Sequence, residues 1–130
     1  MRAFLLISLA LALFTGRAFA HHAFALEYNS NNPLTVTGSV SRMEWVNPHV
    51  HIYVDSKAQD GAVTMWDFEL GSPNGLMRSG WTRNSLKAGD VVTIEGFRAK
   101  DASNVGAVKT LTFNGKKMFA GNANSEAPAK

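Results

Sequence analysis

The chain has 130 residues, 45% of them hydrophobic, and its 13 Lys and Arg against 10 Asp and Glu give a formal charge of +3. This length suits one domain with its own core, and the lack of cysteine excludes disulfides, a thiol nucleophile and a lipid anchor on Cys. Arg2 and Arg17 lie in a predicted leader, so 13 minus 2 leaves 11 basic against 10 acidic residues. Because no basic run exceeds Lys116-Lys117, we expect no nucleic-acid partner.

Residues 1–20 have the features of a secretory signal peptide. Arg2 provides a positive charge, residues 3–14 form an apolar run broken by one serine, and residues 18–20 have the small-x-small pattern of a cleavage site. The apolar run is shorter than the roughly 20 residues that span a bilayer. The sequence therefore predicts a periplasmic or secreted protein that has no membrane contact after cleavage.

The cleavage point decides the new amino terminus. Cleavage after Ala20 would leave His21 and His22 at the front, whereas cleavage after a second small-x-small triplet, residues 23–25, would remove both histidines. We favour the first point, because the second would need an unusually long polar region after the apolar run.

An N-terminal arm over residues 21–33 precedes the first predicted strand. The strand begins at residue 34, with apolar side chains alternating along one face and Gly38 at a sharp bend. Beyond Arg42 the apolar parity shifts, which indicates a β-bulge. The inward residues before the bulge are Leu34, Val36 and Val40, and those after it are Met43 and Trp45.

The second strand carries two histidines on one face. After Pro48, which is tolerated at the first position of a strand, Val50, Ile52 and Val54 alternate with His49, His51, Tyr53 and Asp55. The two imidazoles are two residues apart, or about 7 Å along the strand. Such a pair suits a shared metal ion or anion.

A third strand over residues 62–70 returns beside the second. A loop centred near residue 59 places His51 opposite Asp67 and His49 opposite Glu69, and a slip of two residues would instead pair His49 with Asp67. In either register at least one carboxylate lies beside an imidazole. We therefore predict that Asp67, Glu69 and Tyr53 are the partners that orient the rings.

The rest of the chain predicts a short helix and the end of a barrel. Ser72 as N-cap and Pro73 begin a helix that ends near Gly80 and buries Leu76 and Met77. Strands follow at residues 91–99, with a second bend at Gly96, at 108–113 and at 116–119, and residues 121–130 form a disordered tail. This order predicts an all-β, five-stranded OB-like barrel over residues 34–120 with one short helix between strands 3 and 4; another small β-roll is the alternative.

Several pieces of the sequence resemble an uncharacterised family of small secreted bacterial proteins, a domain of unknown function. The resemblance implies a periplasmic location and brings no settled activity. It covers nearly all of the chain after the leader, from the His-His-Ala-Phe start and the Trp-x-Asn-Pro-His motif onward. The matching pieces are residues 21–24, 45–49, 68–74, 80–83, 86–90 and 96–100.

The four histidines predict a copper site. An amino-terminal His21 offers its amine and its ring Nδ1 to one metal ion, His22 adds a third nitrogen, and His49 or His51 completes the set. Nitrogen ligands in a tetragonal arrangement favour Cu(II). The terminal histidine with a distant partner resembles the histidine brace of copper monooxygenases and periplasmic copper carriers, but their other signatures are missing, so oxygenase activity is not implied.

Simpler interpretations stand beside the metal site. In these, the terminal histidines are solvated, and His49 and His51 only form cross-strand pairs, each of which contributes about 0.2–1 kcal/mol. A second hypothesis is a non-enzymatic OB-like module that binds a small anionic ligand or a protein partner. We assign no catalytic residue, because no nucleophile–base pair is visible.

Overall fold

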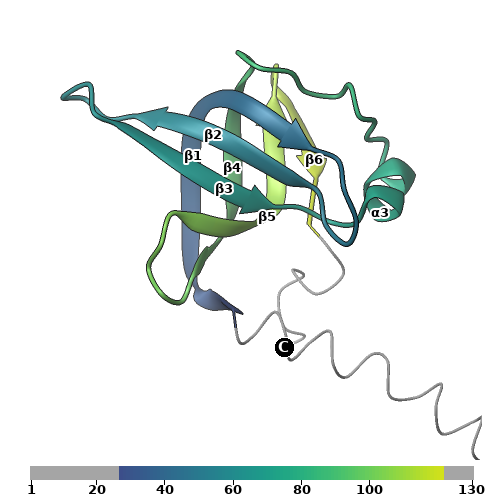
Figure 1. Cartoon of the computed structure of the whole chain (residues 1–130), viewed down its shortest axis with the longest axis horizontal. Helices are drawn as coiled ribbons and strands as arrows, with labels where there is room; N and C mark the ends of the chain where they lie inside the picture. The colour runs from purple at the N-terminus through teal and green to yellow at the C-terminus, as the bar shows by residue number, and fades with distance from the viewer. Residues whose placement is uncertain (1–26, 122–130) are drawn as a thin grey trace, which may run out of the picture.

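Six strands and a short helix make up the part of the chain that the computed structural model describes, residues 27–121. The strands form one sheet in the order β3-β2-β1-β4-β5-β6, and a further parallel pairing of β3 with β5 closes it into a ring (Figure 1). The all-β, OB-like class and the helix between the third and fourth strands are therefore confirmed. The elements are β1 (Tyr28–Glu44), β2 (His51–Lys57), β3 (Val63–Glu69), α3 (Pro73–Arg78), β4 (Val91–Ala99), β5 (Val105–Phe113) and β6 (Lys116–Phe119).

The first strand is longer than the alternation indicated. It begins at Tyr28, so residues 28–33, which we assigned to the arm, belong to β1. The first half of β1 pairs with β4 and the second half with β2, and the register shifts between Val40 and Arg42. This irregularity lies where the parity change predicted a bulge. The leader, the rest of the arm and the tail from residue 122 lie outside the described residues.

Two glycines let neighbouring strands approach closely. A Cβ on Gly38 would overlap the carbonyl oxygen of Asp55 on β2, and a Cβ on Gly96 would overlap the carbonyl oxygen of Ala107 on β5. Both positions were predicted to be bends, and the register of β4 against β5 shifts between Glu95 and Gly96. Strand curvature at these two positions therefore depends on the missing side chain.

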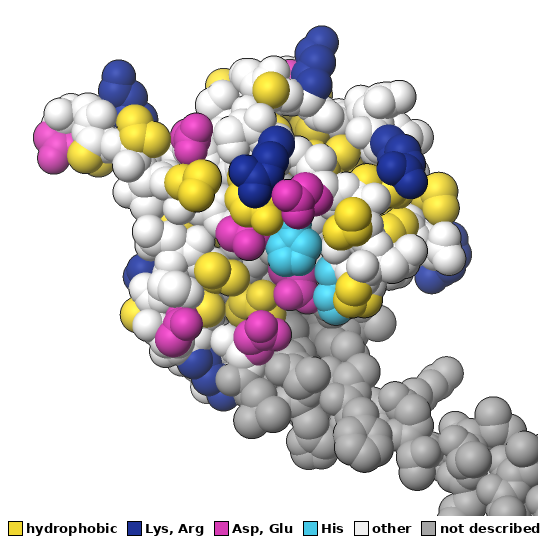
Figure 2. All heavy atoms as spheres, in the orientation of Figure 1, with side chains coloured by type: hydrophobic (Ala, Val, Ile, Leu, Met, Phe, Trp, Pro, Cys, Tyr) yellow, Lys and Arg dark blue, Asp and Glu magenta, His cyan; other side chains and the backbone are white. Residues whose placement is uncertain are grey.

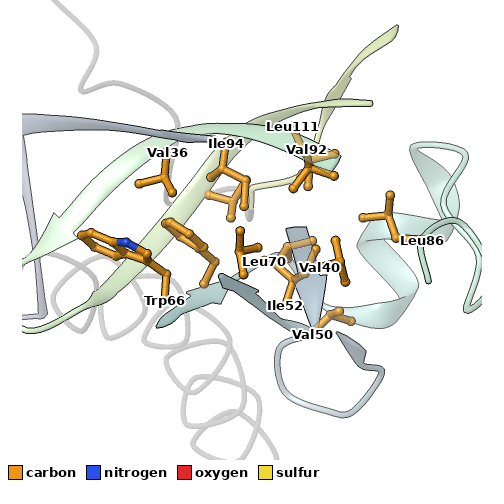
Figure 3. Packing of buried hydrophobic residues seen from close by; sticks show 14 of the residues in the cluster. Val36, Val40, Val50, Ile52, Trp66, Leu70, Leu86, Val92, Ile94 and Leu111 are labelled. Carbon is orange, nitrogen blue, oxygen red and sulfur yellow. The ribbon is translucent and has the colours of Figure 1, made fainter. Parts of the chain in front are cut away.

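The barrel interior is filled by the inward faces of the strands (Figure 3). The predicted apolar face of β2 is fully enclosed, and Trp66 and Phe68 of β3 stack with ring centroids 5.6 Å apart. Leu76 is buried as predicted, but Met77 is 53% exposed, so its predicted burial is wrong. A helix of six residues presents only about one side chain per turn to the barrel, and here the buried residues are Pro73 and Leu76.

The helix begins and ends as its sequence indicates. The Ser72 side chain accepts a hydrogen bond of 3.1 Å from the backbone N–H of Gly75, and Pro73 occupies the first turn. Behind the helix, the indole Nε1 of Trp81 donates to the carbonyl oxygen of Phe119 at 3.0 Å, which links this segment to β6. Within residues 27–121 the structure contains no helix of sufficient length and apolarity to cross a bilayer.

We expect Gly96→Ala to lower the free energy of unfolding by at least about 2 kcal/mol, because the new methyl group meets backbone atoms of β5 that cannot rotate away. Denaturant unfolding measures the change. Val91→Ala, at an exposed position of the same strand, is the control and should cost less than about 1 kcal/mol. Equal effects of the two substitutions would contradict the close approach.

Candidate functional site

Two histidines lie beside carboxylates on the outer face of β2 and β3. His51 is the first residue of β2 and His49 lies just before it, with side chains 30% and 34% exposed. The Nδ1 atom of His49 is 2.8 Å from Oε1 of Glu69, and the Nδ1 atom of His51 is 2.8 Å from Oδ1 of Asp67. Figure 2 shows the histidine side chains side by side, with acidic side chains around them.

The strand register behind these contacts differs from both predicted registers. His51 lies opposite Glu69, and Tyr53 lies opposite Asp67. The predicted pairs nevertheless form, because each histidine reaches diagonally to the carboxylate two residues away from its direct partner. Diagonal neighbours in a twisted antiparallel pair remain within reach of long side chains. The expected contacts are therefore present, and the expected backbone pairing is wrong.

The carboxylates determine which nitrogen of each ring is available. An ionised carboxylate only accepts hydrogen bonds, so a ring nitrogen 2.8 Å from it carries the proton. In the neutral imidazole the lone pair is then on Nε2. Within residues 27–121 neither Nε2 atom has a hydrogen-bond partner, and both rings are partly exposed. His49 and His51 thus each present a ring nitrogen with a lone pair on the same face.

Glu69 is held on both of its oxygens. Its Oε1 contacts His49, and its Oε2 accepts a hydrogen bond of 2.9 Å from the phenol of Tyr28. Tyr28 is only 3% exposed and lies at the start of β1, 41 residues away in sequence. Burial raises the pKa of the Tyr28 phenol well above its ordinary value, and the negative charge of Glu69 raises the pKa further.

A second group of polar side chains lies beside the histidines on β1. Glu44 is directly opposite His51, and Arg42 is directly opposite Tyr53. Arg42 contacts Glu44 at 3.2 Å and stacks its guanidinium 3.6 Å from the Tyr53 ring centroid. The Tyr53 hydroxyl donates to Glu44 at 3.4 Å. Tyr53 is therefore a neighbour of the histidines but orients Glu44 rather than a ring.

The face carries more negative than positive charge. Three carboxylates, on Glu44, Asp67 and Glu69, surround the histidines, and Arg42 is the one cation in contact with this group among residues 27–121. Since Arg42 is already paired with Glu44, it is not available to hold an anion. The local charge favours a cationic ligand over the anionic ligand of the second hypothesis.

The described residues supply only part of the predicted metal site. The structure brings His49 and His51 together, whereas His21 and His22 lie outside residues 27–121. Within that range no three His, Asp, Glu or Cys side chains form a group that could hold a metal ion. The four-histidine site therefore remains a prediction.

A family model described as "Family of unknown function (DUF6152)" matches residues 9–109. The chain belongs to this family. The expected membership of a domain of unknown function is therefore confirmed, and the family brings no named activity. A search of the curated proteins finds no match to the chain.

Among solved structures, the chain is similar to a mitochondrial single-stranded DNA binding protein of S. cerevisiae, Rim1, at 11% sequence identity and a TM-score of 0.49. The match covers 64% of this chain and 94% of that chain. The prediction that excludes a nucleic-acid partner is corrected here, because a protein of similar architecture is named for binding single-stranded DNA. A low number of basic residues was not a sufficient reason for the exclusion, which is withdrawn.

Two contacts of the site were not predicted from the sequence. The bond from Tyr28 to Glu69 joins residues from distant strands, and Tyr28 stands in a polar stretch with no alternating pattern. Glu44 was also missed, although the bulge at Arg42 offered a signal. A parity shift after Arg42 places Glu44 on the same outer face as the histidines.

We expect the Tyr28 phenol to resist ionisation above pH 10, the ordinary pKa of a tyrosine. The unfolded phenol ionises near pH 10, and the folded one ionises only at higher pH, so the unfolded state loses its proton first. The free energy of unfolding should therefore fall as the pH rises above about 10. Tyrosinate absorbance and denaturant unfolding measure the two effects.

Tyr28→Phe is the matched variant for this titration. It should remove the resistant phenol from the absorbance curve and make the free energy of unfolding depend less steeply on pH in the alkaline range. If the Tyr28 phenol of the wild-type chain ionises near pH 10, the buried bond to Glu69 is incorrect.

Proposed function

We propose that the chain binds a copper(II) ion through the Nε2 atoms of His49 and His51, completed by His21 and His22 at the amino terminus of the processed protein. The compartment of this function is the periplasm or the cell exterior. The observation that carries the proposal is the contact of both Nδ1 atoms with carboxylates, which leaves both Nε2 atoms as outward-facing acceptors.

The carboxylate contacts are the arrangement that metal-binding histidines commonly have. A ligating histidine usually gives its other ring N–H to a carboxylate, which holds the tautomer, orients the ring and raises its basicity. His51 and Asp67 form such a hydrogen bond at 2.8 Å, and Nδ1 of His49 lies at the same distance from Glu69. One such pair is common in proteins as a simple ion pair. Two parallel pairs, two residues apart on the same face, favour a shared ligand.

Two nitrogens do not complete a copper site, so the proposal needs further ligands. Copper(II) favours a tetragonal set of nitrogen and oxygen ligands. Tyr28 is hydrogen-bonded to Glu69, which contacts His49, so the chain enters the described domain close to the histidine pair. The six residues from Tyr28 back to His22 span at most about 20 Å when extended. That length allows the terminal histidines to reach the pair.

Charge and position on the fold add support. The carboxylates of Glu44, Asp67 and Glu69 favour a divalent cation near His51. His51 begins β2 and His49 lies in the segment that joins β1 to β2, and OB folds commonly bind ligands on the face of their second and third strands. The position on the fold supports the proposal by analogy only, and the histidine geometry supports it independently.

We expect the processed protein to bind one copper(II) ion per chain. His49→Ala and His51→Ala should each weaken binding by at least about 100-fold, because each removes a ligand rather than an outer partner. Calorimetric titration at neutral pH with a competing chelator measures the affinity. Lys57→Ala, at an exposed position of β2, should bind as the wild type does. Wild-type affinity in both histidine variants would overturn the proposal.

A second preparation tests the amino terminus separately. One extra glycine before His21 keeps both histidines but converts the terminal amine into an amide, which removes one ligand. His49 and His51 are unchanged in this preparation, and we expect a large loss of copper(II) affinity. If the affinity is unaffected, the terminal chelate is wrong and only the His49–His51 part stands. If one metal ion binds two chains, a second copy supplies the missing ligands.

A further inference from the structure

We infer that Tyr28 is a positioning residue of this site. Its phenol holds one oxygen of Glu69 so that the other oxygen keeps the Nδ1 proton of His49 in place, which directs Nε2 of His49 outward. The inference rests on the proposed metal function for its purpose, but the contacts that carry it are independent of any metal.

The Tyr28 ring is fixed by a small apolar cluster of its own. Tyr28, Ala99 and Ala107 are buried together, with Phe97 and Val105 packed against them, apart from the main core. Ala107 on β5 is also the backbone partner of Glu69 in the parallel pairing that closes the barrel. The ring therefore packs on the strand that lies beside Glu69. This packing explains how a residue at the start of β1 reaches a carboxylate at the end of β3.

The two histidine–carboxylate pairs differ in how firmly they are held. Glu69 has a side chain only 15% exposed and uses both oxygens, one for Tyr28 and one for His49. Asp67 has a side chain 32% exposed, and its one side-chain hydrogen bond among residues 27–121 is to His51. A carboxylate held at both oxygens has little freedom to rotate. Glu69 is therefore the more fixed of the two carboxylates, and Tyr28 is the reason.

The backbone at Tyr28 is anchored to β4. Tyr28 pairs with Ala99 on β4, and the neighbouring carbonyl oxygen of Glu27 accepts a hydrogen bond of 3.0 Å from the N–H of Lys100. The phenol binds Glu69 from that anchored position. Tyr28 thus joins the Glu69–His49 contact to the anchored start of the described chain.

Tyr28→Phe tests the inference, and Tyr53→Phe is the matched control. Both remove one hydroxyl from a strand residue near the histidines, but the Tyr53 hydroxyl donates to Glu44 instead of Glu69. The first readout is the ring nitrogen NMR signature of His49 and His51 without metal. In the wild type we expect His49 as a single form with the proton on Nδ1. In Tyr28→Phe we expect a mixture of the two tautomers at His49, with His51 unchanged.

The second readout is the copper(II) affinity of the same samples. Loss of a partner that orients a ligand typically lowers metal affinity 10–100-fold, and we expect a drop of about 10-fold in Tyr28→Phe. Tyr53→Phe should keep the wild-type ring signature and lose clearly less affinity than Tyr28→Phe. An unchanged His49 signature in a folded Tyr28→Phe variant would overturn the inference, as would equal changes in both variants.

Glu69→Asp is a second variant, which tests the inference even if Tyr28→Phe does not fold. It keeps Tyr28 and the negative charge, but the shorter side chain cannot contact Tyr28 and His49 together, so the mixture at His49 should reappear. If it does not, the inference is wrong. The ring signature also separates this inference from the proposed function. A wild type that binds no copper but loses its single His49 form in Tyr28→Phe would overturn only the function.

Discussion

The parallel pairing of β3 with β5 is the constraint on which the site depends. It joins only three residue pairs, Asp67 with Val105, Phe68 with Gly106 and Glu69 with Ala107, but it closes the ring of strands. Gly106 allows this contact, because any side chain there would meet the ring of Phe68. The same three positions of β3 carry both carboxylates of the site and one large core residue. Closure and site geometry are therefore fixed by the same short contact.

Regular alternation made much of the architecture predictable from the sequence. Val50, Ile52 and Val54 could only be buried together if β2 were a strand, and that placed His51 and Tyr53 outside. The helix start at Ser72 was predictable because capping uses local residues. The exposure of Met77 was not, since a helix of six residues has no periodicity long enough to define its buried face.

The site was predictable in composition and less so in geometry. The contacts of His51 with Asp67 and of His49 with Glu69 were predictable because all four side chains lie on the same face of their strands. A slip of the hairpin by two residues leaves them on that face. The register itself was set by a loop whose centre the sequence places only to within a residue. Tyr28 could not be found, because its bond to Glu69 depends on barrel closure and no local pattern encodes a contact across 41 residues.

The irregularity between Val40 and Arg42 determines what kind of surface the histidines share. Because Ser41 is the extra residue there, Arg42 and Glu44 face outward, and Met43 opposite Ile52 packs against the core. If Ser41 were paired in a regular ladder with no bulge, the earlier alternation would continue through the end of β1. Met43 would then lie beside His51 and Glu44 would point into the barrel. The bulge therefore places the carboxylate of Glu44, rather than the thioether of Met43, beside His51. Carboxylate oxygens favour harder metal ions than a thioether sulfur does.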